Sequence, residues 1–159
     1  MEVIVHPLPP LYDRDSAVLI LGSFPSVASR QTCFFYGHPQ NRFWQVIAAV
    51  TGQRAPQSVE EKKQLILSNH LALWDVIGQC RITGSQDSSI RQVVPNDIRP
   101  ILDETGLRRI FCNGATAMRY YEKYILPDTG LRAVQLPSTS PANAVWSLDR
   151  LVEAWRQIL

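Results

Sequence analysis

The feature that most constrains the fold is an unbroken apolar run at residues 17–21, Ala-Val-Leu-Ile-Leu, which ends at Gly22 and Ser23. A strand with one exposed face alternates apolar and polar residues, whereas a strand inside a parallel sheet is apolar on both faces because helices cover both. The Gly-Ser pair is a turn signal that ends the strand. The run therefore predicts a parallel sheet between two layers of helices.

Later segments continue this pattern. Strands that alternate with helices predict an α/β fold, here a three-layer α/β/α sandwich with a central, mainly parallel four-stranded sheet. No internal repeat or linker divides the chain, so residues 1–159 are expected to form a single domain. We expect further strands at 71–77, 110–112 and 132–136, and a short edge strand at 3–5. Helices are expected at 42–50, 60–70, 96–103, 115–126 and 147–158, with N-caps at Ser58 and Asn96 and a helix stop at Pro127. The segments 24–40 and 78–89 are expected to be loops.

Composition narrows the class of protein. Cys33, Cys80 and Cys112 are scattered, with no Cys-x-x-Cys pair and no histidine at ligand spacing, which favours free thiols in a reducing cytoplasm and no metal. Three cysteines cannot build a four-cysteine iron–sulfur cluster on one chain, and we expect no cofactor. The N-terminus lacks a basic segment followed by an apolar run, and no apolar stretch approaches the ~18 residues of a membrane span. We expect a cytoplasmic, monomeric protein without membrane contact.

The loops that follow the predicted strands carry the most unusual residues. They are residues 22–41, 113–114 and 137–143. In open α/β sheets, ligands bind in the crevice beyond the carboxyl ends of the strands, so these three loops are expected to meet there. The net charge is only +2, so a nucleic-acid partner would be held by a local patch and by backbone N–H groups.

The first of these loops contains three consecutive aromatic residues, Phe34, Phe35 and Tyr36, before a Gly-His-Pro turn. Three aromatics in a row exceed what one inward face of a segment can bury. Either all three nevertheless pack in the core, or at least one is partly exposed and can stack on a nucleobase, which contributes ~1–3 kcal/mol.

These motifs resemble the uracil-DNA glycosylase superfamily, and most closely its hypoxanthine (deoxyinosine) glycosylase branch. The mismatch-specific uracil glycosylases also carry an aromatic residue followed by His-Pro-x-Asn-Arg-Phe-Trp, which this chain has at residues 38–44. The likeness spans nearly the whole chain. Its other parts are the blocks at residues 22–26, 73–77, 84–88, 111–114 and 138–143.

The resemblance implies a role for each matching residue. Tyr36 would stack on a base turned out of the helix, Asn113 would read the polar edge of the base with its amide, and Asn41 would be catalytic, orienting water or polarising the sugar–base bond. Ser23 and Phe24 would also contact the base. Pro25, Ser26, Ser138, Thr139, Ser140 and Asn143 would contact DNA, through the minor groove and phosphates.

The resemblance also implies the activity. The chain would be a monofunctional DNA glycosylase of base excision repair, which hydrolyses the N-glycosidic bond of deaminated bases, preferentially hypoxanthine, in double-stranded and possibly single-stranded DNA. Many uracil glycosylases have Asp or Asn in the Gly-x-x-Pro motif, but here Phe24 precedes Pro25. This departure matches the hypoxanthine branch. The alternatives are a uracil or mismatch-specific glycosylase and a catalytically weak module that binds damaged DNA.

For several residues the sequence allows two roles. Asp75 is either a functional carboxylate or a structural hydrogen-bonding residue, and His38 either approaches substrate or fixes a turn. Asp87 is expected to form a turn, and Asn143 either stabilises its loop or contacts DNA. Arg30 and Arg42, beside the first loop, are candidate phosphate ligands.

Overall fold

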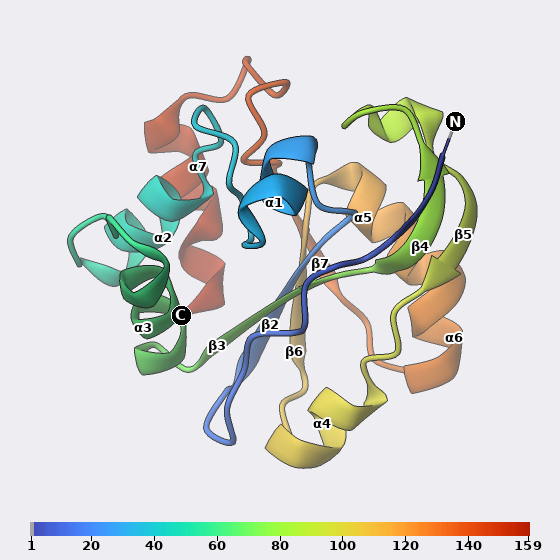
Figure 1. The fold of residues 1–159 in the computed structure, drawn as a ribbon. Coiled ribbons are helices and arrows are strands. Elements are labelled where there is room, and N and C mark those ends of the chain that lie inside the picture. Colours follow the sequence, from blue (N-terminus) through green and yellow to red (C-terminus); the bar gives the residue numbers. More distant parts are fainter. Residues whose placement is uncertain (1) are drawn as a thin grey trace.

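The computed structural model describes residues 2–159 and has a four-stranded parallel sheet at its centre (Figure 1). The strand order is β3 (Leu71–Asp75), β2 (Val18–Gly22), β6 (Arg109–Asn113) and β7 (Val134–Leu136), and all neighbours run parallel. The apolar run lies in β2, where every residue is buried. The predicted α/β fold with a parallel four-stranded sheet is confirmed.

Each face of the sheet packs against its own helical layer. Ile20 faces a core shared with α2 (Phe43–Thr51), α3 (Val59–Ser68) and α7 (Leu148–Trp155). Its neighbours Leu19 and Leu21 face a second core, because successive side chains of a strand point to opposite sides. That second core involves α4 (Arg99–Thr105), α5 (Ala115–Tyr120) and the π-helical turn Tyr121–Ile125, and Leu126 of α6 (Leu126–Thr129) packs against it. This is why β2 is apolar on both faces.

A second, antiparallel sheet flanks the first in the order β1-β4-β5. It consists of β1 (Glu2–Val5), β4 (Ile77–Ile82) and β5 (Arg91–Pro95). The predicted loop at 78–89 is therefore wrong in its first part, since β4 fills residues 77–82 and the strand predicted at 71–77 breaks at Val76. Register irregularities in β4 blur its alternation of apolar and polar residues. No residue of β5 is buried, so β5 carries no periodic signal in the sequence.

Two predicted helix ends are wrong. Pro127 does not stop the helix, which continues through α6 to a left-handed cap at Gly130, because proline fits the first turn of a helical segment, where its missing N–H is not needed. Asn96 does not cap α4, which begins at Arg99. Its amide instead donates to the carbonyl oxygens of Asp75 and Ile77, at 2.9 and 3.3 Å.

The remaining helices agree with the sequence except for two short additions, one in the predicted loop 24–40 and a 3-10 helix at Asp87–Ser89. Ser58 caps α3 as predicted, since its side chain accepts from the Glu61 N–H at 3.1 Å. Ser147 caps α7, which is followed by a 3-10 turn at Arg156–Ile158. The predicted loop 24–40 contains a short helix, α1 (Val27–Thr32), capped by Ser26. Within residues 2–159 no helix combines the length and hydropathy of a membrane span.

Candidate active site

A cavity of about 740 Å³ opens where the strands of the parallel sheet end. Three loops meet there, as the sequence predicts: residues from 22–41, Asn113, and residues 138–142 all line it. Asp75 and residues 85–88, from the end of β3 and the loop after β4, complete the wall. The sequence did not place that last segment in the site, because the antiparallel sheet that carries it was not predicted.

Thr139 joins the two amides of the site. Its side chain is fully buried, and its hydroxyl accepts from Asn113 Nδ2 at 3.0 Å and donates to Asn41 Oδ1 at 2.9 Å. The Thr139 N–H donates to Asn113 Oδ1 at 3.0 Å, which fixes the orientation of that amide. The side chain of Thr139 therefore positions Asn41 and Asn113. Since it is buried between them, the minor-groove or phosphate contact expected of its hydroxyl is corrected to this internal role.

Asn41 presents only donors to the cavity. Its Oδ1 accepts from the Phe43 N–H at 2.9 Å as well as from Thr139. An amide oxygen has two lone pairs, and both are used. The two hydrogens on Nδ2 are the groups left for a ligand, so Asn41 can donate a hydrogen bond but cannot accept one from a water molecule.

Arg42 holds the loop that contains Thr139. Its guanidinium donates to the carbonyl oxygens of Trp146, Ser140 (3.2 Å) and Asn143 (3.1 Å). It is thus committed inside the protein, and the phosphate contact considered for Arg42 is not supported by its position. The amide of Asn143 donates to the Ser138 carbonyl oxygen at 3.0 Å, which agrees with the loop-stabilising alternative for that residue.

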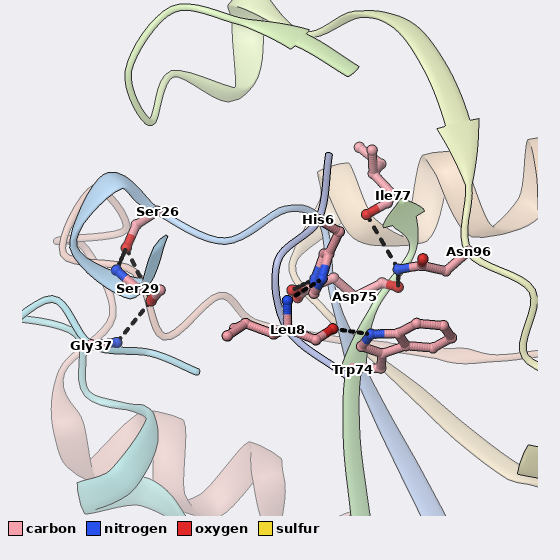
Figure 2. A network of polar contacts seen from close by, with 9 residues as sticks. All are labelled: His6, Leu8, Ser26, Ser29, Gly37, Trp74, Asp75, Ile77 and Asn96. Atoms are coloured by element: carbon pink, nitrogen blue, oxygen red, sulfur yellow. Dashed lines mark hydrogen bonds and ion pairs between the residues drawn. The ribbon is translucent and has the colours of Figure 1, made fainter. Parts of the chain in front are cut away.

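The three aromatics before the Gly-His-Pro turn divide between core and cavity. Phe34 and Phe35 are buried, although Phe35 also borders the cavity, whereas Tyr36 is half-buried and lines it. Its ring stacks on Phe43 with centroids 3.9 Å apart. Tyr36 has a left-handed backbone, φ 53°, and the next residue is tied to α1 because the Gly37 N–H donates to Ser29 Oγ at 2.9 Å (Figure 2).

The hydroxyl of Tyr36 is buried and has no hydrogen-bond partner within residues 2–159. Burial, and secondarily the carboxylate of Asp75, raises the pKa of Tyr36 well above its ordinary value. The Asn113 amide nearby offsets part of this rise in pKa. Tyr36 therefore keeps its proton throughout the physiological pH range.

Asp75 lies at the end of β3 and forms a buried pair with His6, at 2.7 Å between His6 Nε2 and Asp75 Oδ2 (Figure 2). His6 packs edge-to-face against Phe24, with ring centroids 5.9 Å apart. The sequence predicts Asp75 as a candidate functional carboxylate, but His6 was not predicted as its partner. No local signal marks His6, because it reaches Asp75 only through the pairing of β1 with β4.

The other predicted residues lie around the cavity. Ser23 Oγ donates to Asp87 at 3.4 Å, and partial desolvation raises the pKa of that carboxyl. Ser26 caps α1, and the Arg30 guanidinium lies over Phe24 and donates to the Gly84 carbonyl oxygen at 2.8 Å. The cavity lining also includes Ser23, Phe24, Pro25, Ser26, His38, Ser138 and Ser140 but not Asn143. Within the described residues, no three His, Cys, Asp or Glu side chains are grouped to hold a metal ion.

Comparisons with known proteins agree on one family. The model of the uracil DNA glycosylase superfamily matches residues 9–159. A hypoxanthine DNA glycosylase of Methanosarcina acetivorans is 34% identical over 158 residues, 98% of each chain, and one of Methanosarcina barkeri is 31% identical over 138 residues, 85% of each. The solution NMR structure of a Methanosarcina acetivorans protein superimposes with a TM-score of 0.81 at 31% identity, covering 99% of both chains.

Proposed function

Because this chain belongs to the uracil DNA glycosylase superfamily, we propose that it is a DNA glycosylase that removes deaminated bases, preferentially hypoxanthine, and leaves an abasic site. The observation that carries this proposal is the single cavity that unites Tyr36, Asn41 and Asn113. Two relatives similar over most of the chain are named hypoxanthine DNA glycosylase, which favours hypoxanthine over other deaminated bases.

The base has to leave the double helix to enter this cavity. Flipping costs a few kcal/mol and costs least for a mispaired base, which itself favours a deaminated lesion. Phe43 covers one face of the Tyr36 ring, and the ring borders the cavity. A flipped base stacked on Tyr36 would gain ~1–3 kcal/mol, which offsets much of the flipping cost.

Breaking the N-glycosidic bond leaves positive charge on the deoxyribose and negative charge on the base. Asn41 is placed to donate from Nδ2 to the departing base, because its oxygen is already occupied by Phe43 and Thr139. A fixed donor aimed at developing negative charge contributes about 10²–10³-fold in rate. Of the two roles implied for Asn41, polarisation of the base is therefore the one we retain.

The reaction forms no covalent link to the protein in this proposal. No lysine is found among the described residues that line the cavity, so no amine is at hand to form a Schiff base with the sugar. Water takes the place of the base on the deoxyribose carbon, and the strand remains uncut.

The loop after β7 is the proposed contact with the minor groove. Arg42 fixes this loop by donating to three of its carbonyl oxygens. Val145, in the same loop, is 81% exposed. An apolar side chain on a rigid loop can enter the gap that a flipped base leaves. Ser138 and Ser140, which are half-buried at the cavity, are the proposed phosphate donors.

A small panel of duplexes tests the function. Each carries one deoxyinosine, deoxyuridine or deoxyxanthosine, and base release is measured with enzyme in excess. We expect fastest release of hypoxanthine and an abasic product without strand cleavage. Faster release of uracil would favour the uracil-glycosylase alternative, whereas tight lesion binding without release of any base would favour the damage-binding module.

A further inference from the structure

The carboxylate of Asp75 and the hydroxyl of Tyr36 both approach the α-carbon of Gly22. A β-carbon at position 22 would lie 2.4 Å from Asp75 Oδ1 and 3.1 Å from the Tyr36 hydroxyl. Glycine thus lets the Asp75 carboxylate lie against the backbone of residue 22, since any side chain there would collide with the carboxylate. All three residues line the cavity, so the carboxylate and the hydroxyl belong to one corner of its wall.

The hydrogen bonds of His6 determine what Asp75 presents to the cavity. The Leu8 N–H donates to His6 Nδ1 at 3.1 Å, so Nδ1 carries no proton. His6 Nε2 therefore carries the proton of a neutral imidazole and donates it to Asp75 Oδ2 at 2.7 Å (Figure 2). Oδ2 is occupied, and Oδ1, which lies beside Gly22 in the cavity wall, is the oxygen left as an acceptor.

This arrangement is held from several sides. The His6 ring packs edge-to-face against Phe24 and Trp74, with centroids 5.9 and 6.2 Å away. The Trp74 indole N–H donates to the Leu8 carbonyl oxygen at 3.0 Å, which fixes the segment that donates to His6. The Asn96 amide binds the Asp75 carbonyl oxygen at 2.9 Å. The imidazole cannot turn without losing these contacts, and the carboxylate cannot turn without losing its bond to His6.

This corner of the cavity is polar. The buried Tyr36 hydroxyl lies there with the Asn113 amide nearby, and a polar group of a ligand bound there would need a partner of its own. The stacking face of Tyr36 and the Asp75 acceptor belong to the same cavity. A planar ring lying on Tyr36 can therefore direct a polar edge toward Asp75.

A fixed acceptor distinguishes nucleobases by one atom. Hypoxanthine, xanthine and uracil carry a ring N–H beside a carbonyl, as guanine and thymine do, whereas adenine and cytosine have a ring nitrogen with a lone pair at that position. We propose that Asp75 is a specificity-determining residue, whose Oδ1 accepts a hydrogen bond from the ring N–H of the flipped base and repels adenine and cytosine, which lack that N–H. This inference rests on the proposed glycosylase function and assigns to Asp75 its discrimination against adenine and cytosine, with Asn113 beside it.

The pair with His6 makes the consequence of Asp75→Asn specific. Because His6 Nε2 keeps its proton, the oxygen of the introduced amide has to face His6 and its NH₂ group has to face the cavity. The variant then offers a donor where the wild type offers an acceptor. It should accept a ring nitrogen with a lone pair and reject a ring N–H.

The test measures equilibrium binding of duplexes that carry uncleavable 2′-fluoroarabino nucleotides of hypoxanthine or purine, the latter with neither ring N–H nor carbonyl. We expect wild type to prefer hypoxanthine about 10- to 100-fold, the range of one hydrogen bond to a charged group. In Asp75→Asn this ratio should fall to about 1 or invert, while Asp103→Asn, an exposed carboxylate on α4, should keep it.

Several outcomes would overturn the proposal. If wild type binds both duplexes equally, Asp75 does not select the base, and this measurement does not require a folded variant. If folded Asp75→Asn keeps the wild-type ratio but loses hydrolysis of every base equally, Asp75 acts on water instead. Because binding is measured without cleavage, a wild type that selects hypoxanthine but releases no base would contradict the glycosylase function and leave base selection by Asp75 supported.

Discussion

The hydroxyl of Thr139 donates a hydrogen bond to the side-chain oxygen of Asn41 over 2.9 Å, although the two residues lie 98 positions apart in the sequence. The same hydroxyl accepts from Asn113. One buried threonine thus sets the direction of both amides in the cavity. It fixes Asn41 as a donor before any ligand arrives, so no reorganisation is needed during the reaction.

Replacing Thr139 by valine, which has a similar shape but no hydroxyl, should destabilise the fold by ~1–3 kcal/mol because Asn113 Nδ2 loses its acceptor, although the backbone N–H of residue 139 still donates to Asn113 Oδ1. Hypoxanthine release should slow about 10- to 100-fold, since Asn41 Oδ1 then keeps the Phe43 N–H but loses the Thr139 hydroxyl, and the amide is less well aligned. Chemical denaturation and single-turnover rates measure the two effects. Thr139→Ser keeps the hydroxyl and serves as the control; equal loss in both variants would show that the hydroxyl is not what matters.

Replacing Tyr36 by alanine should weaken binding to an inosine duplex by the stacking free energy, ~1–3 kcal/mol, or about 5- to 150-fold in Kd. Tyr36→Phe keeps the ring and should retain most of the binding. Fluorescence anisotropy with labelled duplexes gives both values. An unchanged Kd in a folded Tyr36→Ala protein would mean that the base stacks elsewhere.

Val145→Ala should weaken binding to an inosine duplex about 10-fold, because the apolar wedge no longer fills the gap left by the flipped base. Binding to single-stranded DNA with the same lesion should change little, since there is no stack to replace. Val59 on α3 is also exposed, and Val59→Ala is the matched control. Equal weakening on single- and double-stranded DNA would argue against a wedge.

The three cysteines should differ sharply in reactivity. Burial, with a smaller effect of Glu122, raises the pKa of the Cys112 thiol to about 12, so at pH 8 Cys112 is protonated and unreactive. Burial also raises the pKa of Cys80, whereas Cys33 is exposed. A disulfide reagent should modify one thiol rapidly in the native protein and three in denaturant, and Cys33→Ser should remove the rapid phase. Rapid modification of a second thiol would contradict the packing of the sheet.

The sequence predicts those parts of the fold that depend on local pattern. The run at residues 17–21 gave the central strand because both faces of β2 are covered, and the turn signals after strands located the loops of the cavity. The strand β5 was not predictable, because an edge strand with no buried residue has no apolar period. The helix stop predicted at Pro127 is wrong because proline is accepted in the first turn of a helical segment as well as after its end.

Only those site residues that lie in recognisable sequence motifs were predictable. Tyr36, Asn41 and Asn113 come from motifs that resemble a known family, and the structure brings all three to one cavity. The partners that direct them were not predictable. The pair of His6 with Asp75 spans 69 positions and the bond between Thr139 and Asn41 spans 98, and such contacts depend on how the two sheets and the loop after β7 pack.

The role of Asn41 as a donor separates two mechanisms that the sequence left open. Asn41→Ala should lower the rate of base release by about 100-fold or more with little loss of binding. The hydrogen bond that the variant lacks is strong only in the transition state, when negative charge develops on the base. Asn41→Ala does not distinguish a residue that donates to the base from a residue that holds the attacking water, because both roles are lost. Asn41→Asp distinguishes them, because it replaces the free donor by an acceptor.

The most direct test is the single-turnover rate of hypoxanthine release from an inosine duplex by wild type and Asn41→Asp, with the Kd of each measured on an uncleavable duplex. If Asn41 donates to the departing base, Asn41→Asp releases hypoxanthine at least about 100-fold more slowly than wild type at pH 7. A rate for Asn41→Asp that equals or exceeds the wild-type rate would mean that residue 41 activates water, and would contradict the mechanism proposed for this cavity.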